Sequence, residues 1–153
     1  MKKLKLIPGA PNEIIMEREF AAPRALVHRA MTEPELVKRW LGNECSALID
    51  VQVDLRVGGS YRHVFRRPDG VEFTFTGIYR ELGVDRTVHT ERFNDMPGEA
   101  VVTTTLTERY GVTTMRMVEA FESAEVRDFV LGTGMADGAG LSYDNLERLL
   151  SEL

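Results

Sequence analysis

The chain has 153 residues, of which 43% are hydrophobic and 28% charged, as in an ordinary folded domain. The net charge of −5 argues against a nucleic-acid partner, which would require a basic face. No apolar stretch approaches the roughly 20 residues that a membrane helix needs, so no membrane partner is expected. The one cysteine, Cys45, fits a reducing compartment, and the start of the chain lacks the apolar segment of a secretion signal. A cytoplasmic location is therefore expected, with Cys45 as a small buried side chain.

The first twelve residues contain two prolines and a glycine, and they are predicted to form a flexible N-terminal arm, residues 1–12. No internal repeat, low-complexity stretch or linker follows. Residues 13–153 are therefore predicted to form a single domain.

Two short helices are predicted after a first strand at residues 13–20. Pro23 suits the first turn of a helix, which the pattern places at residues 24–31. Pro34 then opens a second helix that runs to about Trp40.

Six further strands are predicted because apolar and polar residues alternate between groups of turn residues. They span residues 46–55, 60–67, 71–82, 86–93, 100–108 and 112–121. Their connections have the length of hairpins, which makes neighbouring strands antiparallel.

The last thirty residues are predicted to be helical, with Ser123 as the N-cap and a break at Gly132-Thr133-Gly134. Apolar and small residues then recur at spacings of three and four on one face. They are Met135, Ala139, Ser142, Leu146, Leu149 and Leu153. This long amphipathic helix is the available cover for the concave side of a curved sheet. The predicted class is α+β, a curved antiparallel sheet wrapped around a long C-terminal helix, with two short helices after the first strand.

Aromatic side chains share one face of two neighbouring predicted strands, and methionines lie on the last strand and the last helix. Such a face is either a filled core or the wall of an apolar pocket. Four glycines, at positions 77, 134, 138 and 140, favour a pocket with vacated volume or close approach of the backbone. The predicted ligand-binding residues are Trp40, Tyr61, His63, Phe65, Phe73, Phe75, Tyr79, Met115, Met117 and Met135. Among these, His63 and Tyr79 would supply orienting hydrogen bonds.

No pattern predicts a catalytic, metal or cofactor site. Histidine, cysteine and acidic residues lack the spacing of zinc ligands, and neither a phosphate-binding glycine motif nor a nucleophile elbow occurs. His63 could act as a base, and Glu91 or Glu72 as an acid, if they are buried. A hydrogen-bonded histidine and solvated carboxylates are the commoner outcomes, so an enzyme is the less expected class.

Short motifs that carry a family resemblance extend over nearly the whole chain. They read REFAAP at 18–23, TEPEL at 32–36, WL at 40–41, DLRVGGSYR at 54–62, DG at 69–70, GIY at 77–79, TERF at 90–93, RD at 127–128, GM at 134–135 and SYDNL at 142–146. With the order of elements, they resemble the SRPBCC superfamily, also called START-like or Bet v 1-like, and within it the Activator of Hsp90 ATPase homologue 1-like family. The resemblance implies a helix-grip fold with a cavity between the sheet and the C-terminal helix. His28 and Gly140-Leu141 stand where many relatives carry larger aromatic residues, which would reshape that cavity.

The resemblance implies binding of a hydrophobic small molecule in the cavity as the leading function. One alternative is activation of an Hsp90-type chaperone ATPase, although the eukaryotic namesake has a separate chaperone-binding domain for which this chain has no counterpart. Another is a cyclase- or hydrolase-like enzyme that acts on a polyketide-like ligand. A homodimer, formed through an exposed strand or the N-terminal arm, is a further expectation.

Overall fold

The computed structural model describes residues 3–153, which form one antiparallel sheet and the helices that cover it. In chain order the elements are β1 (Lys5–Ile7), β2 (Glu13–Phe20), α1 (Arg24–Thr32), α2 (Pro34–Val37), β3 (Ala47–Val53), β4 (Ser60–Arg66), β5 (Glu72–Leu82), β6 (Arg86–Phe93), β7 (Ala100–Arg109), β8 (Val112–Ala120), α3 (Ala124–Leu131) and α4 (Met135–Glu152). The strands lie in the order β1-β2-β8-β7-β6-β5-β4-β3. Within the described residues, no helix combines the length and the apolar character needed to cross a bilayer.

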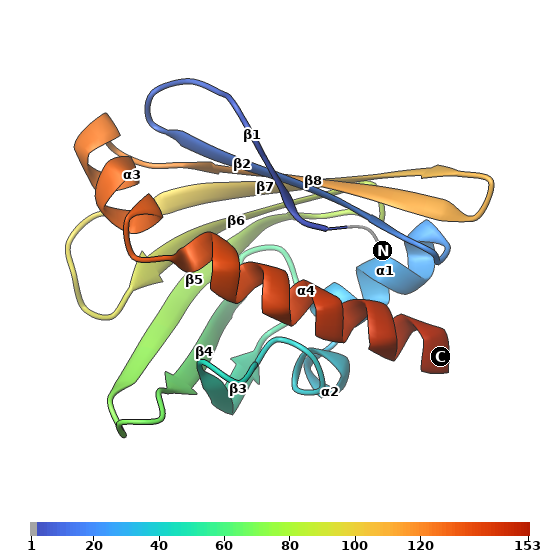
Figure 1. Ribbon diagram of the computed structural model, residues 1–153, viewed down its shortest axis with the longest axis horizontal. Helices are drawn as coiled ribbons and strands as arrows, with labels where there is room; N and C mark the ends of the chain where they lie inside the picture. Colours follow the sequence, from blue (N-terminus) through green and yellow to red (C-terminus); the bar gives the residue numbers. More distant parts are fainter. Residues whose placement is uncertain (1–2) are drawn as a thin grey trace.

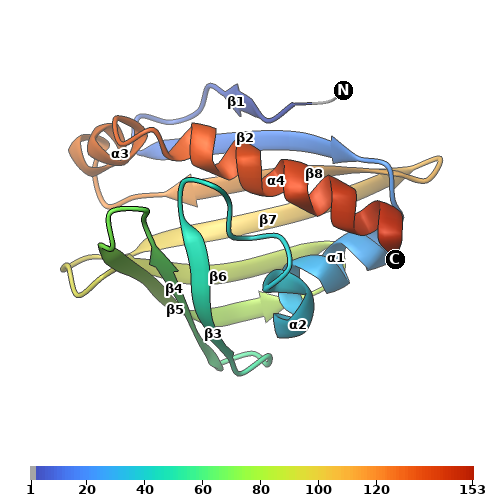
Figure 2. The ribbon, with the colours of Figure 1, turned by 60° about the horizontal axis from the view of Figure 1, so that its bottom comes forward.

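The sheet curls around the helices, as the helix-grip prediction requires. Helix α4 runs across the concave face along β2 and β8, and α1 lies beside its C-terminal half (Figures 1 and 2). Strands β3 to β5 bend forward on the other side, so the sheet surrounds the helices from two directions (Figure 2). The predicted fold is confirmed.

The N-terminal segment is more ordered than the sequence suggested. Residues 5–7 of the expected flexible arm form β1, which pairs with β2 through Lys5↔Glu17 and Ile7↔Ile15. A turn reverses the chain between the two strands: Glu13 N–H donates to the carbonyl of Ala10 at 2.9 Å. The turn brings β1 against the edge of β2, so this part of the arm is a strand.

Three other details differ from the sequence predictions. Helix α2 ends at Val37 because the following residues form tighter turns, as in the 3.0 Å bond from Arg39 N–H to Leu36 O. Leu153 is 47% exposed because α4 ends one residue before it. Cys45 is exposed, in a turn where its N–H donates to Asn43 Oδ1 at 2.8 Å.

The main core lies where α4 meets α1, β2 and β8. The Tyr143 ring stacks on Trp40 at a centroid distance of 5.6 Å and meets the edge of Phe20 at 6.2 Å. Leu146 and Leu149 of α4 are buried in the same cluster. Ser142 Oγ fixes the helix by donating to the carbonyl of Leu41 at 2.6 Å. The middle and the end of α4 are therefore packed solidly onto the sheet.

Candidate functional site

The aromatic face predicted on β4 and β5 is present. In the antiparallel register, Tyr61 lies opposite Gly77 and His63 opposite Phe75. Position 77 has to be glycine, because an added Cβ would lie 1.9 Å from Thr90 O and 2.6 Å from Tyr61 Cε1. The missing side chain lets the Tyr61 ring cross β5 and reach β6.

A cavity of about 90 Å³ lies between α1 and the concave face of the sheet. Helix α1 contributes His28, Met31 and Thr32, and the sheet contributes Tyr61, His63, Tyr79, Thr87, His89, Thr104, Leu106 and Met117. All three histidines of the chain therefore line one cavity, although they lie far apart in the sequence.

Two polar contacts hold the start of α1 over this cavity. Thr113 Oγ1 of β8 donates to the carbonyl of Ala22 at 2.7 Å. Arg24 N–H, the first of the helix, donates to Glu108 Oε1 of β7, also at 2.7 Å. The carboxylate thus occupies the N-terminus of the helix, where the exposed N–H groups favour negative charge. Both contacts fix the roof of the cavity to the hairpin end of β7 and β8.

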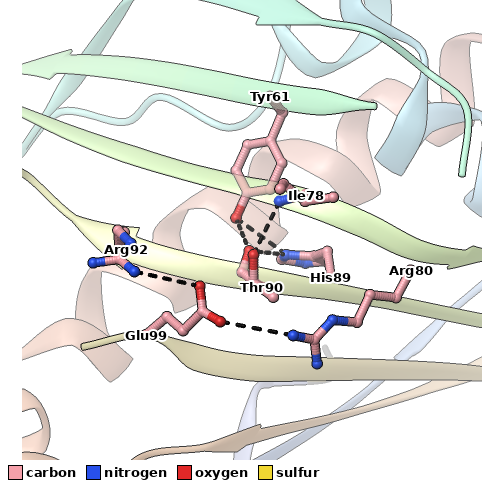
Figure 3. Close-up of polar contacts among 7 residues, drawn as sticks. All are labelled: Tyr61, Ile78, Arg80, His89, Thr90, Arg92 and Glu99. Carbon is pink, nitrogen blue, oxygen red and sulfur yellow. Dashed lines mark hydrogen bonds and ion pairs between the residues drawn. The ribbon is translucent and has the colours of Figure 1, made fainter. Parts of the chain in front are cut away.

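A larger groove, of about 660 Å³, lies on the outer side of β3 to β6. Polar side chains such as Gln52, Arg62 and Arg92 line it. Glu99 lies between two arginines there, at 3.6 Å from Arg80 and 3.8 Å from Arg92 (Figure 3). These exposed, loosely paired charges are worth little energetically. The smaller inner cavity, with convergent polar groups on apolar walls, is the better candidate site.

Tyr61 and His89 meet at the backbone of Thr90 (Figure 3). The Tyr61 hydroxyl donates to Thr90 O at 2.7 Å. His89 Nδ1 lies 3.1 Å from that carbonyl oxygen and 3.1 Å from the Tyr61 hydroxyl. The Thr90 side chain also fixes this strand pair, because its Oγ1 accepts from Ile78 N–H at 3.0 Å. The cavity wall at β6 is therefore held rigidly.

His63 and Tyr79 present polar atoms to the cavity without a hydrogen-bond partner in residues 3–153. Burial and, as a smaller cause, the neighbouring His89 lower the pKa of His63 to about 4. Burial raises the pKa of Tyr79 to about 12. Both side chains are uncharged at neutral pH, so the cavity offers neutral donors and acceptors.

A carboxyl pair lies deeper on the same face. Glu119 of β8 is only 5% exposed, and it shares a hydrogen bond with Glu91 of β6. Burial raises the pKa of Glu119, and the negative charge of Glu91 raises it further. Burial, then Glu91 and Glu119, also raise the pKa of Tyr143 on α4, which places these groups in one interior polar region.

The predicted site residues divide into two groups. Tyr61, His63, Tyr79 and Met117 line the cavity. The other six lie elsewhere: Phe65, Phe73 and Phe75 cluster with Phe93, Trp40 and Met115 belong to the main core, and Met135 packs beside Ile14 and Phe121. Sequence reasoning missed His28, Met31, Thr32, Thr87, His89, Thr104 and Leu106.

The cavity also lies in a different place from the one expected. No residue of α4 lines it, since Tyr143, Leu146 and Leu149 fill the space between α4 and the sheet. The glycines of α4 do not mark a close approach, because a Cβ added at Gly138 or Gly140 would meet no heavy atom within 4 Å. The cover of the cavity is α1.

Acid is expected to destabilise the protein through His63. Between pH 6.5 and 4 the unfolded chain protonates this histidine and the folded chain does not, so stability is lost as the pH falls. A pKa difference of this size corresponds to about 3 kcal/mol. Urea unfolding from pH 8 to pH 4 should show this loss in the wild type and not in His63→Gln. Parallel pH profiles for the two proteins would contradict the burial of His63 as a neutral group.

Comparison with known proteins agrees with the fold and the motifs. The family model described as Activator of Hsp90 ATPase homolog 1-like protein matches residues 21–151. A crystal structure of a Rhodobacter sphaeroides protein is similar at a TM-score of 0.92 and 27% identity, over 99% of both chains. A Nitrosomonas europaea protein has a TM-score of 0.84 and 27% identity, over 95% of this chain and 97% of its own.

A third crystal structure, of a Chromobacterium violaceum protein, has a TM-score of 0.78 and 29% identity, over 92% of this chain and 97% of its own. The comparison with curated proteins gives no match. The family match extends from the residues just before α1 to the end of α4, and so it includes both the roof and the walls of the cavity. The chain belongs to the Activator of Hsp90 ATPase homolog 1-like family and has the helix-grip fold of the SRPBCC superfamily.

Proposed function

We propose that the chain binds an apolar small molecule in the cavity between α1 and the sheet. The observation that carries this proposal is the pairing of apolar walls with unpartnered neutral polar groups. Met31, Leu106 and Met117 supply apolar surface, while the His63 ring and the Tyr79 hydroxyl have no hydrogen-bond partner within the described chain. Their polar atoms are not fully enclosed by protein, so the polar group of a ligand in the cavity can bond to them.

The size of the cavity restricts what it encloses. About 90 Å³ is less than the roughly 150 Å³ that encloses benzene in an engineered apolar cavity. Without any change of shape, the cavity can therefore enclose only one end of a larger ligand. Met31 and Met117 can widen it, because the unbranched methionine side chain adapts its shape at low cost.

Native mass spectrometry of protein purified without denaturation tests this function. We expect an added mass that leaves on denaturation, provided that the host supplies a ligand above its dissociation constant. Thr104→Leu should abolish it, because Thr104 is buried at the cavity and leucine fills the space. Its stability should fall by no more than about 1–3 kcal/mol, the usual cost of added methylene groups in a packed core.

Thr103→Leu is the matched control on the same strand. Thr103 is half-buried, does not line the cavity and points to the opposite face of β7 from Thr104. This variant should change the stability by about 1 kcal/mol or less and keep the added mass. An added mass that persists in Thr104→Leu would exclude the cavity as the binding site.

The family description supports a second candidate, activation of an Hsp90-type chaperone ATPase. Its test is the ATPase rate of the chaperone with and without the purified chain, and an unchanged rate excludes this candidate.

The enzyme alternative needs an ionisable group at the cavity. His63 and His89 meet that requirement. The test is turnover of a polyketide-like compound, which His63→Ala should abolish while the fold is retained.

A further inference from the structure

His89 lies far from His28 and His63 in the sequence, and the structure places it with them in the cavity wall. It lies on β6 opposite Tyr79 of β5 and Val102 of β7, on the concave face. Its ring meets the edge of the Tyr61 ring at a centroid distance of 5.2 Å, and the Tyr79 ring lies at 6.1 Å. Two aromatic rings and a strand pair therefore fix its orientation.

Nδ1 of His89 has two polar neighbours, the carbonyl oxygen of Thr90 at 3.1 Å and the Tyr61 hydroxyl oxygen at 3.1 Å. The Tyr61 hydroxyl donates its one proton to the Thr90 oxygen at 2.7 Å, so it does not also donate to Nδ1. The proton of the neutral ring is therefore assigned to Nδ1, which can donate to the Thr90 oxygen. In the neutral ring, a protonated Nδ1 leaves the lone pair on Nε2.

Nε2 has no hydrogen bond within residues 3–153, yet it is not sealed in the protein. Among residues 3–153, the side-chain atoms that are fully enclosed and have no hydrogen-bond partner are Arg18 Nε and Glu147 Oε2, and His89 Nε2 is not one of them. His89 lines the cavity, so Nε2 retains access to the cavity space. With its proton on Nδ1, His89 presents Nε2 to the cavity as an oriented hydrogen-bond acceptor.

We propose that His89 Nε2 selects the ligand by accepting a hydrogen bond from it, so that the cavity takes molecules carrying a hydroxyl or N–H group. This inference rests on the proposed ligand-binding function and specifies its chemistry. Tyr79 complements it, because its hydroxyl can donate to the oxygen of the same ligand hydroxyl. A ligand hydroxyl would then both donate to His89 and accept from Tyr79, and an ether could only accept.

Phenol and anisole are compared because anisole replaces the hydroxyl proton of phenol with a methyl group. Both are larger than benzene, so each enters only as Met31 and Met117 widen the cavity. Each is titrated into protein labelled with ¹⁵N at histidine, and the imidazole nitrogens are followed by NMR. In the free protein, His89 should show a protonated Nδ1 and a lone pair on Nε2. Phenol should shift the Nε2 signal and bind at least tenfold more tightly than anisole. A tenfold ratio of affinities corresponds to about 1.4 kcal/mol, a usual value for one good hydrogen bond.

Three results would overturn the proposal, and they separate it from the function it rests on. A lone pair on Nδ1 in the free protein, or equal affinity for phenol and anisole, overturns the role of His89 and leaves cavity binding intact. If neither probe perturbs His63 or His89 at millimolar concentrations, the inference and the proposed function both fail.

His89→Asn provides the variant test. The asparagine amide can still donate near the position of Nδ1, and the acceptor at Nε2 is lost. The ratio of phenol to anisole affinity should fall close to one. Thr103→Asn is the control, because Thr103 lies on β7 next to Thr104 and does not line the cavity, and it should keep the wild-type ratio. If His89→Asn does not fold, the protonation state and the affinity ratio of the wild type still decide the question.

Discussion

Replacement of Trp40 by alanine should lower the free energy of unfolding by about 3–5 kcal/mol, the usual cost of truncating a buried aromatic residue. Trp40 is 4% exposed and stacks on Tyr143, and its Nε1–H donates to the carbonyl of Ala30 at 2.8 Å. Alanine leaves a void between α1 and α4 and an unpaired carbonyl. Urea denaturation monitored by circular dichroism measures the loss.

Trp40→Phe separates the ring from its hydrogen bond. Phenylalanine keeps apolar contact with Tyr143 and leaves the carbonyl of Ala30 unpaired, so a cost of about 1–3 kcal/mol is expected. Neither variant should change phenol affinity under conditions where it is folded, because Trp40 does not line the cavity. A loss of phenol binding with unchanged stability would instead make Trp40 a ligand contact, as the sequence predicted.

Glu119→Gln should be more stable than the wild type in alkaline solution. Folding raises the pKa of Glu119 above its ordinary value of 4.5, so above pH 4.5 the folded chain holds a proton that the unfolded chain has lost. Stability therefore falls as the pH rises, by up to about 1.4 kcal/mol per pH unit, until the pH passes the raised pKa. Glutamine has a similar shape and does not titrate in this pH range, so its contribution to stability does not depend on pH. The advantage of the variant should grow from pH 4.5 upwards.

Urea unfolding at a series of pH values from 4.5 to 9 measures this advantage. Glu72→Gln is the control for removal of one negative charge, because Glu72 lies exposed on β5 beside Arg66. It should show the same alkaline slope as the wild type. A wild-type slope that survives in Glu119→Gln would show that Glu119 is not held protonated in the interior.

The strands could be predicted from the sequence because alternation and turn residues are local signals. Strand β6 was predicted with its observed bounds, and Ser123 caps α3 through a 3.2 Å bond from Val126 N–H, as expected. β1 was missed because three residues carry too little alternation to predict a strand. Their pairing with β2 depends on the turn from Ala10 to Glu13, whereas the prediction treated residues 1–12 as one flexible arm.

The candidate site could be predicted only in part because strand parity gives the face of a residue and not its depth. Parity placed His63 and Phe75 on the concave face, and both are there, but the cavity lies toward His63. His89 looked isolated in the sequence. Pairing of β5 with β6 brings His89 beside Tyr79, and the absence of a side chain at Gly77 lets Tyr61 reach His89. Both effects depend on residues that are distant in the sequence, so no local pattern predicts them.

Methionine methyl NMR with phenol as the probe distinguishes a binding cavity under α1 from one under α4. Met31 and Met117 line the cavity, while Met135 lies at the start of α4, beside Ile14 and Phe121. With ¹³C-labelled methionine methyl groups, phenol should shift the Met31 and Met117 signals in a saturable manner and leave Met135 unchanged. Saturable shifts at Met135, with Met31 and Met117 unmoved, would place the ligand under α4 and contradict the account.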